Sequence, residues 1–199
     1  MIYELTTIHA AAGRVKDVIA RVEAARLDDL VAVWSTEFGR INDVLLLRRF
    51  ERSASNAETK LLLGRADWLS ALSAVTVDID VTQFQMVPYV CDPQAGSYGA
   101  LHEMRTYVFR LGTFNELLET WKKYLPRRAM MSPAPIIMYS ITGNLQKIVH
   151  IWTYENFEQR TLVREKALDE GVWPAPGGAE RWLSQENALL KPAIFSPLR

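Results

Sequence analysis

The sequence predicts an α+β fold made of two consecutive copies of one unit, and two observations support this prediction. The first is an internal repeat: Glu4-Leu5-Thr6-Thr7 returns 99 positions later as Glu103-Met104-Arg105-Thr106, and the segment 44–51 returns 104 positions later as 148–155. A repeat of this length indicates a duplicated structural unit. The second is the hydrophobic pattern, in which strand-like runs alternate with helix-like stripes in the same order in both halves.

The first unit opens with a run of β-branched and aromatic residues at positions 2–8, which predicts a strand. Gly13 follows, and Val15, Val18, Ile19 and Val22 then recur with helical spacing, which predicts a helix over residues 14–30. Strands are predicted at 31–36 and 43–50, on either side of a turn at Phe38-Gly39-Arg40. A second helix is expected over residues 56–72, and the β-branched run 75–87 forms the closing strand.

The second unit repeats this order, with strands at 101–110, 136–142, 147–154 and 193–195 and helices at 113–124 and 158–170. Pro126, Pro133 and Pro135 cannot continue a helix, so a longer connection is expected after the first of these helices. Residues 92–99 have linker composition, so we expect two domains, at 1–91 and 100–199.

The order strand, helix, strand, strand, helix, strand is the ferredoxin-like, split βαβ arrangement. Each antiparallel sheet would bury one face under its two helices and leave the other face free. Two such sheets can pack face to face and enclose a barrel. The barrel closes either within one chain or between two chains, and the sequence leaves both arrangements open.

Composition narrows the class of protein. The 23 basic and 23 acidic residues cancel, which gives no reason to expect a nucleic acid or an anionic membrane as partner. Cys91 is the only cysteine, so an intrachain disulfide is excluded and a reducing compartment is favoured. The first strand begins at Ile2 and no stretch has the apolar length of a membrane span. We expect a cytoplasmic protein without integral membrane association.

Several segments carry a family resemblance. Tyr3-Glu4-Leu5-Thr6-Thr7, Glu103-Met104-Arg105-Thr106-Tyr107, His150-Ile151-Trp152-Thr153-Tyr154 and Phe195-Ser196-Pro197-Leu198 resemble the NIPSNAP family. The resemblance covers both units, and the second is the closer match, because the first has Leu46-Leu47-Arg48 in place of His150-Ile151-Trp152. It implies a dimeric α+β barrel, akin to small cofactor-independent monooxygenases, and hence a homodimer without a cofactor. The family has no agreed enzymatic activity.

Strand alternation divides the residues of the second unit between two faces. The set Met104, Thr106, Val108, Val149 and Ile151 is expected beneath the helices. The alternate set is expected in the barrel interior: Glu103, Arg105, Tyr107, Ile148, His150, Trp152 and Tyr154. By the same logic the first unit contributes Glu4, Thr6, Arg48 and Phe50 to that interior.

These interior residues are candidates for a small-molecule site with aromatic walls and a few polar groups. Arg105 and Arg48 suit a carboxylate or phosphate, Tyr107 and Trp152 suit a planar ligand, and His150 is the candidate for proton transfer. Glu103, Tyr154 and Glu4 complete the candidate set.

Three interpretations stay open at this point. The first is a ligand- or partner-binding protein, and the second is a cofactor-independent enzyme acting on a small aromatic or polyketide-like substrate. The third is a protein-interaction module that uses the outer helices and has an exposed apolar patch near Trp68 or Trp173. Independently of these, Glu103 and Arg105 have a structural alternative, in which they pair with each other or with cross-strand neighbours in a buried polar cluster.

Other chemistries have little support. His9, His102 and His150 lack the close spacing of a structural zinc site, so no metal is expected. No phosphate-cradling glycine loop and no nucleophile-elbow motif occurs. The basic pairs Lys122-Lys123 and Arg127-Arg128 are explained by a position near a helix C-terminus.

Overall fold

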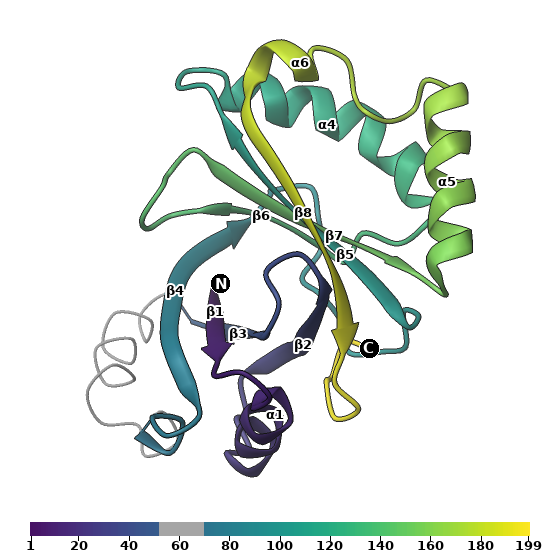
Figure 1. Ribbon diagram of the computed structural model, residues 1–199. Coiled ribbons are helices and arrows are strands. Elements are labelled where there is room, and N and C mark those ends of the chain that lie inside the picture. Colours follow the sequence, from purple (N-terminus) through teal and green to yellow (C-terminus); the bar gives the residue numbers. More distant parts are fainter. Residues whose placement is uncertain (52–69) are drawn as a thin grey trace.

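The structure is a computed structural model, and it describes residues 1–51 and 70–199. The helix predicted at 56–72 lies outside the described residues except for its last three positions. Figure 1 shows two lobes, one built by β1–β4 with α1 and the other by β5–β8 with α4, α5 and α6.

The eight strands of the described residues form one closed barrel in the order β1-β3-β2-β8-β5-β7-β6-β4. Every neighbouring pair is antiparallel. The strands are β1 (Ile2–Ala10), β2 (Leu30–Phe38), β3 (Asp43–Phe50), β4 (Thr76–Met86), β5 (Leu101–Phe109), β6 (Ile136–Ser140), β7 (Lys147–Tyr154) and β8 (Trp182–Pro192).

Each half of the chain supplies one arc of the barrel. The first half contributes β4-β1-β3-β2 and the second contributes β8-β5-β7-β6, and the arcs join at β2·β8 and β4·β6. The same order in both arcs confirms the predicted α+β fold with tandem ferredoxin-like units. The barrel closes within a single chain.

Helices cover the outside of the barrel. Val18 and Val22 of α1 (Val15–Ala24) pack with Val44 and Leu46 of β3. Over the other arc lie α4 (Phe114–Ala129) and α5 (Phe157–Asp169), followed by the short α6 (Gly178–Arg181). None of the helices in the described part of the chain has the length and apolar character needed to cross a membrane.

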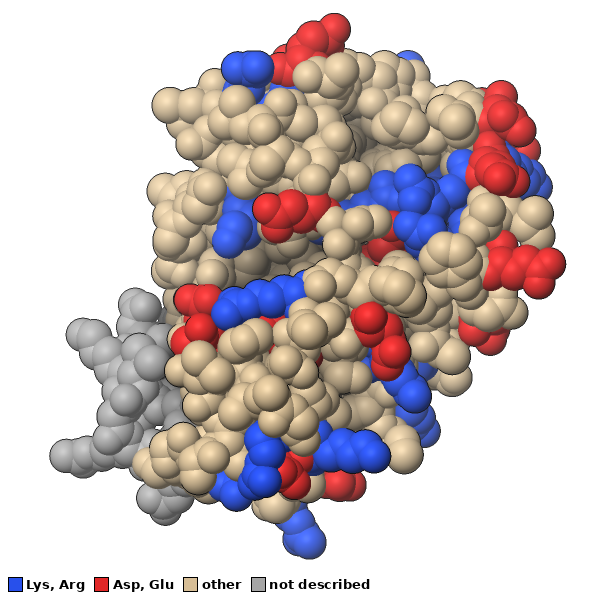
Figure 2. Space-filling view, viewed as in Figure 1, with Lys and Arg blue, Asp and Glu red and all other residues tan. Residues whose placement is uncertain are grey.

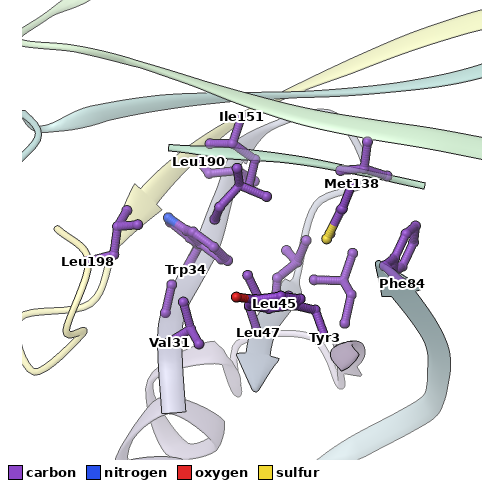
Figure 3. Packing of buried hydrophobic residues seen from close by; sticks show 14 residues of the cluster. Tyr3, Val31, Trp34, Leu45, Leu47, Phe84, Met138, Ile151, Leu190 and Leu198 are labelled. Carbon is purple, nitrogen blue, oxygen red and sulfur yellow. The ribbon is translucent and has the colours of Figure 1, made fainter. Parts of the chain in front are cut away.

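Apolar side chains from all eight of the described strands pack inside the barrel, and Figure 3 shows the buried members of this cluster. They include Tyr3, Leu5, Trp34, Leu45, Leu47, Phe84, Met104, Met138, Val149, Ile151 and Leu190. Leu198, from the C-terminal tail, joins the same cluster and is fully buried. These side chains form a packed core, and beside it a second cavity of about 450 Å³ is lined by residues that include Thr7, Leu45, Met104, Thr106 and Ala188.

This packing corrects the predicted assignment of faces in both units. Val149, Ile151 and Met104 lie inside the barrel, whereas Tyr107, Ile148, Trp152 and Tyr154 pack with α4 and α5. The error has a physical reason: closure buries the face that an open sheet would leave to solvent. The mainly apolar set faces the interior, and the set that contains Glu103, Arg105 and His150 lies beneath the helices.

Several element boundaries also differ from the prediction. The first helix ends at Ala24 instead of residue 30, because Arg26 adopts a positive φ of 46° and redirects the chain into β2. Helix α4 continues through Pro126 to Ala129, since Pro126 lies on its exposed side, where water can satisfy the carbonyl left without a partner. The expected longer connection therefore begins only after residue 129.

The predicted position of the last strand differs most from the structure. Residues 193–195, predicted as a strand, follow β8, which spans 182–192 and pairs with both β2 and β5. Its centre, Ser184-Gln185-Glu186-Asn187, contains no β-branched or aromatic residue, so local propensity gave no signal. Pairing with β5 makes this segment a strand, and pairing with β2 extends β8 over residues 189–192.

Residues 92–99, predicted as a linker, lie against the C-terminal tail. Gly96 forms a bridge with Leu198, and the Ser196 hydroxyl accepts a hydrogen bond from the backbone N–H of Val33 at 3.0 Å. Gly99 has a φ of 109° and passes against the backbone of Tyr154, where a side chain would collide. This segment is thus packed into the structure at one end of the barrel.

His102 provides a test of this core. Its Nδ1 accepts a hydrogen bond from Trp34 Nε1 at 2.8 Å inside the protein, and burial lowers its pKa from 6.5 to about 4. The unfolded chain takes up a proton below pH 6.5 while the folded state stays neutral. Stability is therefore complete above pH 6.5 and is lost as the pH falls toward 4.

We expect His102→Gln, which keeps an acceptor for Trp34 but cannot titrate, to lose less unfolding free energy than the parent between pH 6.5 and 4. Urea unfolding at a series of pH values measures this loss. Identical losses in the two proteins would show that His102 is not shielded from protonation.

Candidate functional site

The carboxylate of Glu103, on β5, is the centre of the candidate site. It is fully buried and accepts hydrogen bonds from Arg105 Nη2 at 3.1 and 3.2 Å and from Arg160 Nη2 at 2.6 Å. Asn187 of β8 donates a further bond at 3.1 Å. Burial alone would raise the pKa of Glu103, but the charge of Arg105 and the bond from Arg160 outweigh it and lower the pKa to about 2. Glu103 is therefore a permanent anion at neutral pH.

Arg128, on α4, is a second buried charge close to this cluster. Only 2% of the residue is exposed. Its guanidinium donates to Ser132 Oγ at 2.9 Å and to the Tyr154 hydroxyl at 3.0 Å, and it lies 4.1 Å from the ring centre of Trp152. Burial lowers its pKa, and Tyr154 offsets part of that effect. Neutral and aromatic groups thus surround a buried cation.

His150, on β7, lies behind these groups within an aromatic cage. Its Nδ1 accepts from Trp152 Nε1 at 2.7 Å, and the rings of Tyr107 and Trp121 stand edge-on at centroid distances of 4.8 and 5.0 Å. Burial, and then the positive charge of Arg105, hold the pKa of His150 well below its usual range. The ring is neutral at physiological pH and serves as a packed structural group.

A cavity of about 480 Å³ opens between α5 and the strands β5 and β8. Figure 2 shows Lys and Arg atoms gathered in a hollow beside α5. The lining comprises Arg105, Tyr107, Arg128, Arg160, Thr161, Arg164, Glu165, Ala167, Leu168, Trp173, Pro174 and Gln185. Among these described residues, four guanidinium groups meet one carboxylate, that of the exposed Glu165.

The sequence of α5 explains how two of these arginines reach the cavity. The helix begins after Asn156, whose side chain accepts the backbone N–H of Gln159 at 2.9 Å. Arg160 and Arg164 are four residues apart and therefore share one face. That face is turned toward Glu103, whereas Phe157 and Leu162 are exposed. An ordinary surface helix buries its apolar residues, so the orientation of α5 serves the charge cluster.

Six of the candidate residues come together on the helix-covered side of one arc: Glu103, Arg105, Tyr107, His150, Trp152 and Tyr154. Glu4 and Arg48 lie in the other arc. Arg48 binds Asp29 through two hydrogen bonds of 2.9 and 2.5 Å, and its Nη1 is 3.9 Å from Glu4. The candidates therefore form two separate clusters.

Sequence reasoning missed the arginines that the helices contribute. Arg128 was explained by the end of its helix, and Arg160 and Arg164 were not singled out. Arg160 and Arg164 could have been found from their separation of four residues on a predicted helix that has no apolar stripe. Trp173, considered as part of an exposed patch, is 8% exposed and lines the cavity. Trp68 lies outside the described residues.

The chemistry available here is recognition of negative charge. Guanidinium groups bind carboxylates and phosphates through paired N–H donors, and these hydrogen bonds are stronger where water is excluded. Within residues 1–51 and 70–199, no group of three His, Cys, Asp or Glu side chains could hold a metal ion. The fold and the site together define an α+β barrel protein with an arginine-lined cavity beneath its helices.

Comparison with known proteins places this barrel in a family. The NIPSNAP family pattern matches residues 102–197. Human NipSnap homolog 3A is 31% identical over 180 residues, which cover 86% of this chain and 73% of that protein. The Dictyostelium discoideum NipSnap homolog is 24% identical over 86% of this chain and 78% of its own length. This chain belongs to the NIPSNAP family.

Other curated NipSnap proteins match over as little as 34% of their own length. Among solved structures, a proposed monooxygenase from Lactobacillus acidophilus superposes with a TM-score of 0.70, covering 96% of this chain and 93% of that chain. The two sequences are 14% identical, so the likeness shows the fold that they share.

The role of Glu103 leads to a prediction about stability. We expect Glu103→Gln to lose about 3–5 kcal/mol of unfolding free energy, because it leaves buried guanidinium groups without their anion. Chemical denaturation measures the loss. Glu165→Gln, which removes an exposed carboxylate from the rim of the same cavity, should stay within about 0.5 kcal/mol of the parent. Equal effects of the two substitutions would contradict the central role of Glu103.

Proposed function

We propose that this protein binds a small organic anion in the arginine-lined cavity beneath α4 and α5. The observation that carries the proposal is the lining itself, in which Arg105, Arg128, Arg160 and Arg164 share one cavity of about 480 Å³. A cavity of this volume fits a small molecule. Burial of arginines is costly for a fold, so a ligand is the simplest reason for their presence.

The remaining lining indicates what the rest of the ligand is like. Tyr107, Trp173, Ala167, Leu168 and Pro174 supply aromatic and apolar surface beside the guanidinium groups. Aromatic walls favour a planar or apolar body packed against them. The ligand we propose therefore has an anionic group at one end and an apolar or aromatic part at the other.

A cofactor-independent monooxygenase-like or isomerase-like enzyme is the second candidate. The whole-chain likeness to the Lactobacillus acidophilus protein, itself a proposed monooxygenase, motivates it. Binding is the better supported function, because His150 is buried, neutral and already bonded to Trp152, while Glu103 is held ionised by arginines. Neither group is free to move a proton at neutral pH.

The proposal extends to assembly and location. We propose a cytoplasmic homodimer whose domains are 1–91 and 100–199, joined by 92–99. Because the barrel already closes within one chain, a second copy would attach through an outer face. The exposed thiol of Cys91 supports a reducing compartment.

Native mass spectrometry of protein purified from its own host tests ligand binding. We expect a co-purifying small mass that leaves on denaturation and carries negative charge in solution. Arg105→Leu should lose that mass, and Arg164→Leu, at the half-exposed rim, should retain less of it without disturbing the core. A parent protein that is empty, or variants that retain the mass as fully as the parent, would overturn the proposal.

A further inference from the structure

Positive charges outnumber negative charges around the cavity, and the size of this excess indicates the charge of the ligand. Glu103 offsets one of the four guanidinium charges in the described lining and is shared by Arg105 and Arg160. Glu165 offsets one more from the exposed rim. Four guanidinium groups and two carboxylates therefore leave a surplus of two positive charges among the described residues.

Arg128 carries the first of these charges. Its partners are the neutral hydroxyl groups of Ser132 and Tyr154 and the ring of Trp152. A cation that is 98% buried without an anion is costly to maintain, because water no longer solvates it. The second is associated with Arg164 at the half-exposed rim, because its ion-pair partner Glu103, at 3.8 Å, is already hydrogen-bonded to Arg105 and Arg160.

Unused hydrogen-bond donors lead to the same conclusion. The Nε atoms of Arg105, Arg128 and Arg160 are buried and have no partner among the described residues. Buried N–H groups are nearly always bonded in folded proteins, so these three guanidinium groups beside one cavity are incompletely satisfied by the described residues. An oxyanion with several oxygen atoms suits this set of donors.

We infer that the ligand is a dianion: a phosphate monoester or a dicarboxylate attached to the apolar body described above. The inference rests on the proposed function and goes further, because it fixes the charge of the ligand at two. Arg128 neutralises the inner part of that charge and Arg164 the part nearer the rim.

Isothermal titration calorimetry near neutral pH tests the inference with three aromatic probes of similar size. Phenyl phosphate and isophthalate are dianions, whereas benzenesulfonate is a monoanion. We expect one of the dianions to bind at least about tenfold more tightly than benzenesulfonate, the gain from one further charge-assisted hydrogen bond. Preference for phenyl phosphate would assign a phosphate monoester, and preference for isophthalate a dicarboxylate.

Two neighbouring arginines of α4 supply matched variants. Arg128→Met should abolish the preference for the dianion, and Arg127→Met should keep it, since Arg127 is exposed and paired with Glu170 outside the cavity. Should Arg128→Met fail to fold, Arg164→Met at the rim replaces it and should reduce the same preference.

The outcomes separate the two proposals. Equal affinity for benzenesulfonate and the dianions, or a preference that neither Arg128→Met nor Arg164→Met reduces, overturns the dianion inference and leaves anion binding intact. Failure of all three probes and of inorganic phosphate to bind at millimolar concentration overturns both.

Discussion

The buried carboxylate of Glu103 is the interaction on which the arrangement of the second half depends. It connects three elements: Arg105 on its own strand β5, Arg160 on α5 and Asn187 on β8. Without this anion, the guanidinium groups on the inward face of α5 would lie against the sheet without a carboxylate to bind. The cavity exists because α5 is oriented by charge, and its wall is therefore made of arginine.

The two halves of the chain share a topology but differ in the chemistry of equivalent positions. Glu4 and Glu103 occupy equivalent positions in the repeat, and each lies on the outer face of the barrel in its own half of the chain. In the first half, Asp29 holds Arg48 through two hydrogen bonds, so that cation has its own anion. Around the cavity of the second half, four arginines meet only two carboxylates among the described residues, those of Glu103 and Glu165. We attribute ligand binding to the second half for this reason.

The sequence predicted much of the fold because the signals were local. The order of elements and the bounds of β3 and β7 followed from hydrophobic runs and the internal repeat. The faces were assigned wrongly because the closed barrel and its helices cover both sides of β5 and β7, so that alternation between Met104 and Arg105 no longer separates core from solvent. Strand β8 could not be predicted, because its polar centre lacks strand propensity and is held in place by pairing with β5.

Only the strand residues of the candidate site were predicted from the sequence. Glu103, Arg105 and Tyr107 were recognised because polar residues in a strand-like run stand out. Arg128, Arg160 and Arg164 were not, because arginine on a helix is normally a surface residue and only the tertiary fold turns these three inward. His150 was singled out for its chemistry, and its burial removes that chemistry.

The most direct test of the account is a crystal structure of the protein grown with selenate, a divalent anion visible by anomalous scattering. The account predicts an anomalous peak in the cavity within hydrogen-bond distance of at least two of Arg105, Arg128, Arg160 and Arg164. Selenate bound only elsewhere, with ordered water filling this cavity, would contradict the claim that these arginines form an anion site.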